Sequence, residues 1–432
     1  MRIVQITPGS GDNFYCENCL RDIALVKALR KLGHDVLMVP LYLPLQIAEA
    51  EPLTNTPIFF GGINVYLQQK FALFRRTPRW IDRWFDSRRL LAWAGRKAGM
   101  TSARDLGAAT ISMLQGEHGR QVKELDRLVD WLCAVGQKPD IVCVSNILLA
   151  GLARRIREKL HVPVVCLLQD EDDFLDGLAA PHAEQAWDIV RERARDIDAF
   201  VAVSKYFAEA MHGRLAVHED RIHVAYVGVA VDEYTPADAH PPVPTIGYLS
   251  RMCPSRGLET LVDAFILLKR NTRLGSAKLR ICGGRSGNDA PFLERLAGKL
   301  AAAGVRDDAE FLEAFDPGSR REFLKSLSVL SVPEPQPVAY GLYVLEALAA
   351  GVPVVEPAIG SFPETIALTG GGILYMPNTA RKLAETIESL LLDPEAARRL
   401  GAEGRAGVRK VFSIERTAAE MIRIYEQVTR KS

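Results

Sequence analysis

Residues 245–270 read TIGYLSRMCPSRGLETLVDAFILLKR, and this stretch decides the fold of the second half of the chain. Its first six residues predict a buried strand, and the residues from Leu258 onward have the apolar spacing of a helix. Helical patterns separate the further apolar runs of this half, which lie at 278–284, 309–315, 327–333 and 353–357. Strands that alternate with helices predict βαβ units and a parallel sheet.

The first half of the chain has the same alternation, with expected strands at 2–7, 35–41, 140–145, 162–168 and 199–204. A proline-rich stretch, AHPPVP at 239–244, has the composition of a linker. A chain of 432 residues is longer than a single hydrophobic core usually supports. We therefore predict an α/β protein of two Rossmann-like, doubly wound domains facing a central cleft. The expected parts are a first domain at 1–240, a second at 245–410, and a C-terminal helix at 411–432 that packs back toward the first domain.

Composition and charge exclude several classes of protein. The formal net charge is +1, so no global field attracts nucleic acid, and we expect no nucleic-acid partner. No apolar run approaches the roughly 18 residues of a membrane-spanning helix, and the first residues lack the layout of a signal peptide. Most of the seven cysteines lie in apolar, strand-like runs. These features indicate a cytoplasmic protein.

Residues 50–130 break the alternation and are expected to form a helical excursion from the first domain. Arginines are interleaved with Trp80, Trp84, Phe85 and Trp93 in this region. One interpretation is a helix with its aromatic face on the core and a solvated basic face. The alternative is that segment 70–96 forms a platform that binds an acceptor substrate, or makes a weak contact with a membrane surface.

Glycines follow the first expected strand, in the turn Pro8-Gly9-Ser10-Gly11. Such a turn lets backbone N–H groups approach an anion, and a helix N-terminus adds partial positive charge. We therefore count Gly9, Ser10 and Gly11 as candidate residues for binding the anionic part of a ligand, such as the phosphates of a nucleotide donor. The third glycine of a dinucleotide motif is absent.

A second set of candidate anion ligands follows strands of the second half. Arg251 and Arg256 lie just after the strand at 245–250, at the carboxyl end where α/β sheets bind ligands. Tyr340, Gly341 and Leu342 open a short helix whose first N–H groups are suited to a diphosphate, and the helical Glu346 is suited to ribose hydroxyls.

These segments resemble the family 4 retaining glycosyltransferases, the group that contains sucrose and glycogen synthase-like enzymes. Segments 247–265, 340–366 and 367–375 carry the resemblance, and 27–41, 199–207 and 227–234 support it more loosely. It implies the two-domain GT-B fold and transfer of a sugar from a nucleotide diphosphate donor to an acceptor that the sequence does not identify. It also implies that Arg251 and Arg256 bind the donor pyrophosphate and stabilise its developing charge, while Glu346 holds the ribose.

The chain departs from the family pattern at two positions. The first of the family's two donor-loop glutamates is replaced by Val338, and we expect the nearby Glu334 or Gln336 to contact the donor sugar instead. A histidine that the family tends to place after a first-domain strand is replaced by Gln169. Gln169 and the adjacent Asp170 are our candidate catalytic residues in that domain.

Several alternatives stay open. The acidic run 170–173 contains a D-x-D pattern, but GT-B enzymes generally use cationic side chains in place of a metal, so no metal or other cofactor is expected. Cys16 and Cys19 have thiol-redox spacing, although we interpret them as structural cysteines. Besides a transferase, the sequence allows a phosphorylase, a sugar-nucleotide epimerase, or a nucleotide-sugar binding protein without turnover.

Overall fold

The computed structural model describes eight stretches of the chain, namely residues 1–8, 17–42, 59–60, 103–134, 138–236, 241–285, 287–312 and 317–431. The chain divides into two compact units. Unit 1 comprises Met1–Ala225 together with Ala418–Ser432, and unit 2 comprises Tyr226–Thr417. The predictions for Gly9, Ser10, Gly11, Cys16 and segment 70–96 lie outside the described residues.

Unit 1 is built on a six-stranded parallel sheet in the order β2-β1-β3-β4-β5-β6. Its central strands consist of apolar and β-branched residues that are buried on both faces, which is the pattern of a parallel sheet covered by helices. The strands are β1 Arg2–Thr7, β2 Asp35–Pro40, β3 Ile141–Val144, β4 Val164–Leu168, β5 Ala199–Ala202 and β6 Ile222–Val224.

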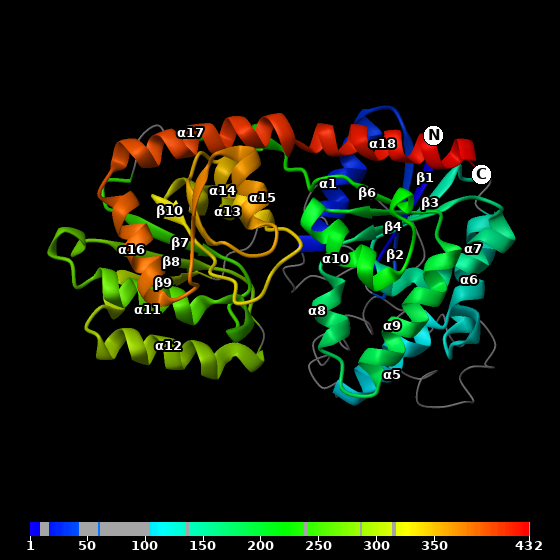
Figure 1. Ribbon diagram of the computed structural model, residues 1–432, viewed down its shortest axis with the longest axis horizontal. Helices are drawn as coiled ribbons and strands as arrows, with labels where there is room; N and C mark the ends of the chain where they lie inside the picture. The colour runs from blue at the N-terminus through cyan, green and yellow to red at the C-terminus, as the bar shows by residue number, and fades with distance from the viewer. Residues whose placement is uncertain are drawn as a thin grey trace. The chain divides into compact units, whose positions relative to one another are not determined.

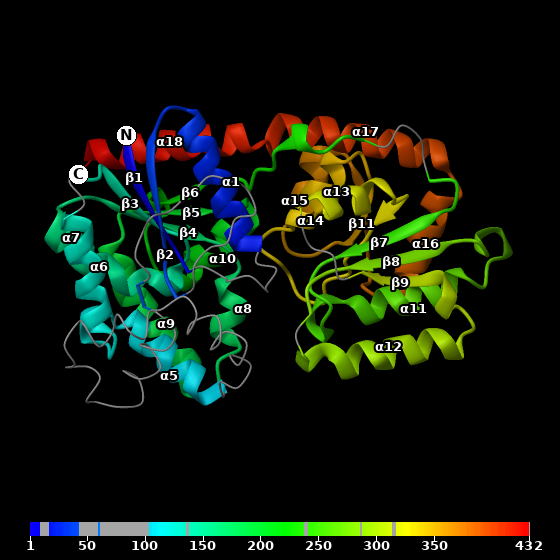
Figure 2. The same cartoon turned by 180° about the vertical axis from the view of Figure 1, so that it is seen from behind.

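Helices cover both faces of this sheet. Helices α1 and α18 lie on one side, and α5 and α9 lie on the other (Figures 1 and 2). Among the described residues, the helices that belong wholly or partly to unit 1 are α1 Glu17–Lys31, α5 Ala103–Leu114, α6 Val122–Ala134, α7 Ala153–Leu160, α8 Glu171–Asp176, α9 His182–Arg193, α10 Lys205–Leu215 and α18 Ile414–Lys431. Within α18, the residues from Ala418 onward are grouped with unit 1.

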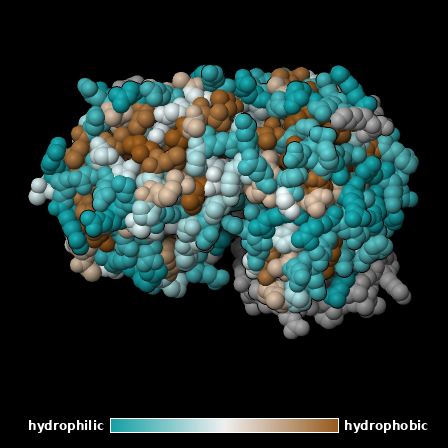
Figure 3. All heavy atoms as spheres, in the orientation of Figure 1, coloured by the Kyte–Doolittle hydropathy of each residue, from teal (hydrophilic) through white to brown (hydrophobic). Residues whose placement is uncertain are grey.

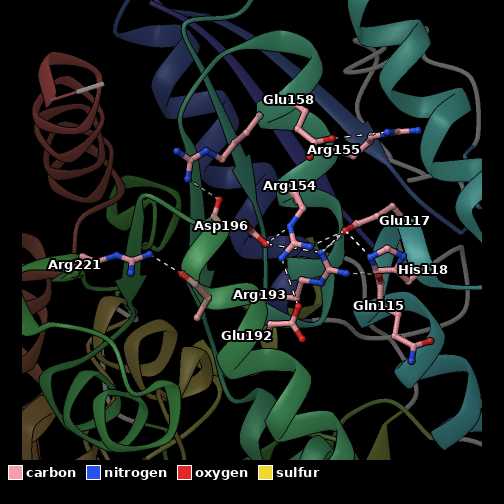
Figure 4. Close-up of polar contacts among 12 residues, drawn as sticks. Gln115, Glu117, His118, Arg154, Arg155, Glu158, Glu192, Arg193, Asp196 and Arg221 are labelled. Carbon is pink, nitrogen blue, oxygen red and sulfur yellow. Dashed lines mark hydrogen bonds and ion pairs between the residues drawn. The ribbon is translucent and has the colours of Figure 1, made fainter.

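A buried ionic network fastens the described part of the 50–130 region to α9 (Figure 4). Arg193, with only 2% of its side chain exposed, donates to the Glu117 carboxylate over 2.8 Å and also bonds the Gln115 carbonyl. Arg154 bonds both Glu117 and Asp196 over 3.0 Å. Because a buried guanidinium needs charged and polar partners, this network holds the turn at 115–118 firmly in place.

Unit 2 has a second six-stranded parallel sheet, in the order β12-β11-β10-β7-β8-β9. Counted from its own first strand, this is the 3-2-1-4-5-6 order of doubly wound dinucleotide-binding domains, with a reversal of strand order between β7 and β10. The strands are β7 Thr245–Leu249, β8 Lys278–Cys282, β9 Ala309–Leu312, β10 Val329–Leu330, β11 Val354–Pro357 and β12 Gly372–Tyr375.

The helices of unit 2 also cover both faces of their sheet. Helices α11 and α12 lie on one side, whereas α13, α14 and α17 lie on the other (Figures 1 and 2). The helices are α11 Leu258–Leu268, α12 Ala290–Ala302, α13 Pro317–Lys325, α14 Leu342–Ala349, α15 Phe362–Thr369, α16 Ala380–Leu391 and α17 Pro394–Val411.

The division between the units falls before the proline-rich stretch at which we expected it. Segment 226–236 belongs to unit 2 because it pairs with the end of α17. The Val229 N–H donates to the Phe412 carbonyl over 2.9 Å, the Ile414 N–H donates to the Val229 carbonyl over 3.0 Å, and the Tyr226 ring packs on Phe412. These contacts link positions far apart in the sequence, so the composition of the linker did not reveal them.

Most of the surface in view is hydrophilic, with hydrophobic patches between the polar side chains (Figure 3). Among the described residues, the large hydrophobic side chains that are exposed are Leu32, Leu106, Leu368 and Met376. Within that same part of the chain, no helix combines the length and the apolar character that crossing a membrane requires.

Candidate functional site

The candidate site of unit 2 is formed by loops at one edge of its sheet. Because β7, β8, β10 and β11 are parallel, the loops that follow them meet at the same carboxyl edge. The loops after β7 and β10 are neighbours there, since these two strands flank the reversal of strand order. The loop after β7 carries both arginines, and the loop after β10 carries the proline-rich segment 333–337.

The loop after β7, here called the arginine loop (residues 250–257), is held by a buried tyrosine of its own unit. The buried Tyr248 hydroxyl lies 2.9 Å from the Arg251 carbonyl oxygen and 3.0 Å from that of Arg256, so one side chain holds both ends of the turn. Gly257, which follows, has a left-handed backbone with φ of +69°, and a Cβ there would lie 2.0 Å from the Pro333 carbonyl oxygen. Only glycine allows the two loops to approach this closely.

Each arginine is oriented by a carboxylate that is itself buried. Arg251 Nη2 lies 3.4 Å from Asp289 Oδ2, and Arg256 Nη1 lies 3.3 Å from Glu334 Oε1. The arginine side chains remain 41% and 35% exposed, whereas those of Asp289 and Glu334 are 7% and 2% exposed. The guanidinium groups therefore present positive charge at the surface of the site, which suits an anionic ligand.

The two residues that we expected to replace the missing glutamate differ in burial. Glu334 is buried, its carboxylate lies 3.3 Å from the Tyr343 hydroxyl, and its carbonyl accepts a 2.8 Å hydrogen bond from Asn378. Gln336 is exposed, and Val338 is only 2% exposed. The structure thus brings Glu334 to Arg256, while sugar contact by Glu334 or Gln336 stays a prediction.

Helix α14 begins at this edge, as the sequence predicts. Gly341 is its N-cap residue, Leu342 is its first residue, and the preceding Tyr340 is buried. The first N–H groups of a helix have no carbonyl partner within the helix and carry partial positive charge. The start of α14 therefore adds to the positive character provided by the two arginines.

Glu346, one turn into α14, has its two carboxylate oxygens bonded to different partners. Tyr234 donates its hydroxyl proton to Oε1 over 2.7 Å, and Arg320 donates to Oε2. Glu346 is 4% exposed and Arg320 is 5% exposed. Burial, and then the nearby carboxylate of Glu346, raise the pKa of the Tyr234 hydroxyl well above its usual value. Sequence reasoning missed both partners.

A fourth buried carboxylate lies beneath the loop after β10. Glu356, on β11, is fully buried, and its oxygens accept hydrogen bonds of 3.2 and 3.3 Å from the Val332 N–H. Burial raises the pKa of Glu356 well above its usual value, and the charge of Glu334 raises it further. This acid anchors the start of the proline-rich segment, a role that the apolar pattern of the strand did not predict.

In unit 1, the candidate catalytic residues lie at the carboxyl end of β4. Gln169 is 1% exposed, and its Nε2 donates to the Ser145 carbonyl. Among the described residues, Gln169 Oε1 and the buried Asn146 Oδ1 have no hydrogen-bond partner. Asp170 has a left-handed backbone, with φ of +70°, and is the N-cap residue of α8. These side chains place polar oxygens at the end of the sheet.

Glu171 organises the same end of the sheet. Its carboxylate accepts the Ile147 N–H over 3.0 Å and the Gln169 N–H over 2.5 Å, which ties the ends of β3 and β4 together. Burial raises the pKa of Glu171 to about 7, although both N–H bonds favour the charged form. Within the described residues, the acidic run 170–173 is not part of any group of three or more His, Cys, Asp or Glu residues able to hold a metal ion.

Two family models match the chain one after the other. "Glycosyltransferase Family 4" matches residues 110–233, and "Glycosyl transferases group 1" matches residues 236–407. Similar proteins include a D-inositol 3-phosphate glycosyltransferase of Xylanimonas cellulosilytica, 30% identical over 249 residues, which are 54% of this chain and 58% of that protein. A GDP-mannose-dependent alpha-(1-6)-phosphatidylinositol monomannoside mannosyltransferase of Mycobacterium tuberculosis is 30% identical over 184 residues, 41% of this chain and 46% of that protein. The chain spans 57–58% of the length of the first curated relatives that it matches.

Solved structures share the fold. Sucrose-phosphate synthase from Thermosynechococcus elongatus superposes with a TM-score of 0.72 at 18% identity, with 100% of both chains covered. HepE from Anabaena, solved in complex with UDP, superposes with a TM-score of 0.69 at 14% identity, covering 99% of this chain and 100% of that one. At these identities the similarity establishes the fold alone.

Proposed function

Because this chain belongs to the family 4 glycosyltransferases, we propose that it transfers a sugar from a nucleotide diphosphate donor to an acceptor, with retention of configuration at the sugar. One observation carries the proposal: two partly exposed guanidinium groups and the start of α14 all lie at the carboxyl edge of the unit 2 sheet. This arrangement suits the diphosphate of a sugar nucleotide.

The proposed mechanism depends on electrostatic stabilisation. When the bond between the sugar and the diphosphate breaks, positive charge develops on the sugar and negative charge on the leaving phosphate. Arg251, Arg256 and the N-terminus of α14 stabilise that negative charge in the transition state. Each such donor typically contributes about 3–4 kcal/mol to lowering the barrier. The acceptor hydroxyl attacks from the face that the diphosphate leaves, and its proton passes to a leaving phosphate oxygen.

The donor is held by unit 2 in this proposal. Gly341, Leu342 and the arginines bind the diphosphate, and Glu346 binds the ribose hydroxyls. Support for a nucleotide sugar comes from the names of similar proteins, since the mycobacterial relative is GDP-mannose-dependent and HepE was solved with UDP-glucose. Guanosine appears in one of these names and uridine in the other, so guanosine, uridine and adenosine diphosphates all belong in the first binding experiment.

The acceptor is held by unit 1 in this proposal. The buried oxygens of Gln169 and Asn146, with Asp170 beside them, are suited to accepting hydrogen bonds from hydroxyl groups. Several relatives are named for inositol-based acceptors, which makes hydroxyl-rich compounds the first acceptors to test. We further propose that the protein works in the cytoplasm and without a metal ion, so EDTA leaves donor turnover unchanged.

Titration calorimetry with UDP, GDP and ADP tests the diphosphate site. Arg251→Ala and Arg256→Ala should each raise the dissociation constant of the nucleotide that binds by about 10-fold to 100-fold, because charge-assisted hydrogen bonds contribute about 1.5–3 kcal/mol. Arg295→Ala is the matched control, because Arg295 is 54% exposed and pairs with Glu259 on the surface of the same unit. Equal affinities in all four proteins would refute the assignment.

A second candidate function is nucleotide-sugar binding without turnover. It is favoured by Val338, which is buried and carries no acceptor atom at the position where the family has its first glutamate. Sugar nucleotide incubated with the purified protein distinguishes the two functions. Slow hydrolysis that Arg256→Ala abolishes supports the transferase, whereas tight binding with no hydrolysis and no transfer supports the binding protein.

A further inference from the structure

Glu346 is bonded on both sides by residues from distant parts of unit 2. Tyr234 comes from the segment before β7, 112 residues earlier in the chain, and its hydroxyl lies 2.7 Å from Glu346 Oε1. Arg320 comes from α13 and bonds Oε2. Each partner therefore holds one oxygen of the carboxylate, which fixes the plane of the group.

Tyr234 is itself held against α13, α14 and α17. Arg405 Nη1, on α17, donates to the Tyr234 carbonyl over 2.6 Å and also to the Ala349 carbonyl at the end of α14. The two residues before Tyr234 form ion pairs as well, Glu233 with Arg321 over 3.3 Å and Asp232 with Arg409 over 2.8 Å. These contacts fix the position of Tyr234 beside Glu346 in the candidate site.

A carboxylate oxygen has two lone pairs, so one bond to each oxygen of Glu346 leaves two acceptor positions. Two vicinal hydroxyls of a ribose ring match two positions on one carboxylate. The charge of Arg320 balances that of Glu346 in a site that is almost fully buried, so the carboxylate can remain an acceptor. The remaining requirement is orientation, which the Tyr234 hydroxyl supplies.

We propose that Tyr234 is a positioning residue, which orients the Glu346 carboxylate toward the 2′- and 3′-hydroxyls of the donor ribose. The proposal rests on the proposed function, because it takes Glu346 as the ribose ligand. Arg405 acts one step further away by holding the Tyr234 backbone. The segment that precedes the second sheet thereby contributes to nucleotide recognition.

The test compares ribonucleotides with nucleotides that lack the ribose hydroxyls. Calorimetry measures dissociation constants for UDP and 2′,3′-dideoxy-UDP, with the guanosine and adenosine pairs in parallel. Tyr234→Phe keeps the ring and removes only the hydroxyl. It should weaken ribonucleotide binding by about threefold to tenfold, the range for one hydrogen bond, and leave dideoxynucleotide binding within twofold of wild type.

Tyr226→Phe is the matched control. Tyr226 lies in the same segment, and its hydroxyl donates to Glu364 over 2.6 Å, so the variant removes a similar hydrogen bond from a carboxylate outside the proposed site. Its ratio of dideoxy to ribo dissociation constants should equal that of wild type. If Tyr234→Phe unfolds, Arg405→Lys replaces it as the test. This variant keeps both the tyrosine and the glutamate but weakens the hold on the Tyr234 backbone, so it should lower the ratio.

The outcomes separate the two proposals. If wild type prefers the ribonucleotide and Tyr234→Phe keeps the same ratio, Glu346 acts without Tyr234 and the inference is wrong. If Tyr234→Phe weakens both ligands equally, the tyrosine is only structural, which also overturns the inference. If wild type binds both ligands equally, or binds no nucleotide, the ribose role of Glu346 in the proposed function fails and the inference fails with it.

Discussion

Replacing Gly257 by alanine tests whether the arginine loop must lie directly against the proline-rich segment. The backbone of Gly257 is left-handed, with φ of +69°, and an added Cβ would lie 2.0 Å from the Pro333 carbonyl oxygen. No side-chain rotation relieves this contact, because a Cβ has no torsion and its neighbour is backbone. Alanine must therefore move the arginine loop away from Pro333 and Glu334.

The expected loss of stability has two parts. Alanine in a left-handed conformation costs about 1–2 kcal/mol. Forcing an extra carbon into a filled space costs about 1–3 kcal/mol more. For a domain of this size, 1 kcal/mol lowers the melting temperature by about 2–4 °C, so Gly257→Ala should lower it by about 4–20 °C.

Gly304 provides the matched control. Its φ is +72°, but a Cβ there would meet nothing within 4 Å. Gly304→Ala therefore carries the same backbone strain without the collision, and its melting temperature should fall by only about 2–8 °C. Thermal unfolding of both variants, followed by circular dichroism, measures the difference.

Nucleotide binding completes the comparison. Gly257→Ala moves the Arg256 guanidinium away from Glu334, so the dissociation constant of the bound diphosphate should rise by about tenfold, the effect of one charge-assisted hydrogen bond. Gly304→Ala should bind like wild type. If the two variants have the same melting temperature and the same affinity, the close approach of the two loops does not matter and this reasoning is refuted.

Two further predictions concern unit 1. The folded-state pKa of Glu171 is about 7, above the ordinary value of 4.5, so the folded protein binds more protons between these pH values and its free energy of unfolding should fall by about 3 kcal/mol as pH rises through them. Denaturant titrations at a series of pH values measure this change. The free energy of unfolding of Glu171→Gln should vary less with pH than that of wild type, and an unchanged pH dependence would contradict the assignment. Arg193→Met leaves the Glu117 carboxylate without its buried partner and should lower the free energy of unfolding by about 3–5 kcal/mol. Adding Glu117→Gln to this variant should recover part of that loss. Equal losses in the single and the double variant would rule out the ion pair as the cause.

Much of the fold was predictable from local patterns. The apolar runs at 2–7 and 245–250 are β1 and β7 in the structure. The short helix expected to open at Tyr340–Leu342 is α14, and the C-terminal helix expected at 411–432 contains α18. Strand β6 was missed, because its three residues are half-buried and include a histidine, so no apolar run marks it. The expected strand at 327–333 shortened to Val329–Leu330, because the chain then leaves the sheet for its proline-rich loop.

The arrangement of the candidate site was predictable only in part. The arginines and the start of α14 follow from the rule that ligands bind at the carboxyl ends of parallel strands. The partners of those residues do not follow from it, because Glu334 meets Arg256 across 78 positions and Tyr234 meets Glu346 across 112. Strand order brings the first pair together, since β10 pairs with β7. The second pair is brought together by Arg405, which bonds the carbonyls of both Tyr234 and Ala349. No local pattern encodes either arrangement.

The burial of Val338 has a consequence for engineering. Its carbonyl accepts the Ser361 N–H over 3.1 Å, and the Gly360 Cα presses so closely on its backbone that an added Cβ would lie 2.5 Å from the Val338 nitrogen. A glutamate grafted at this position would enter a pocket that leaves the valine 2% exposed, and would lose its hydration without a built-in partner. A designer who wants a carboxylate at this position must therefore supply a hydrogen-bond donor or a cation together with it, because a buried charge without a partner is destabilising.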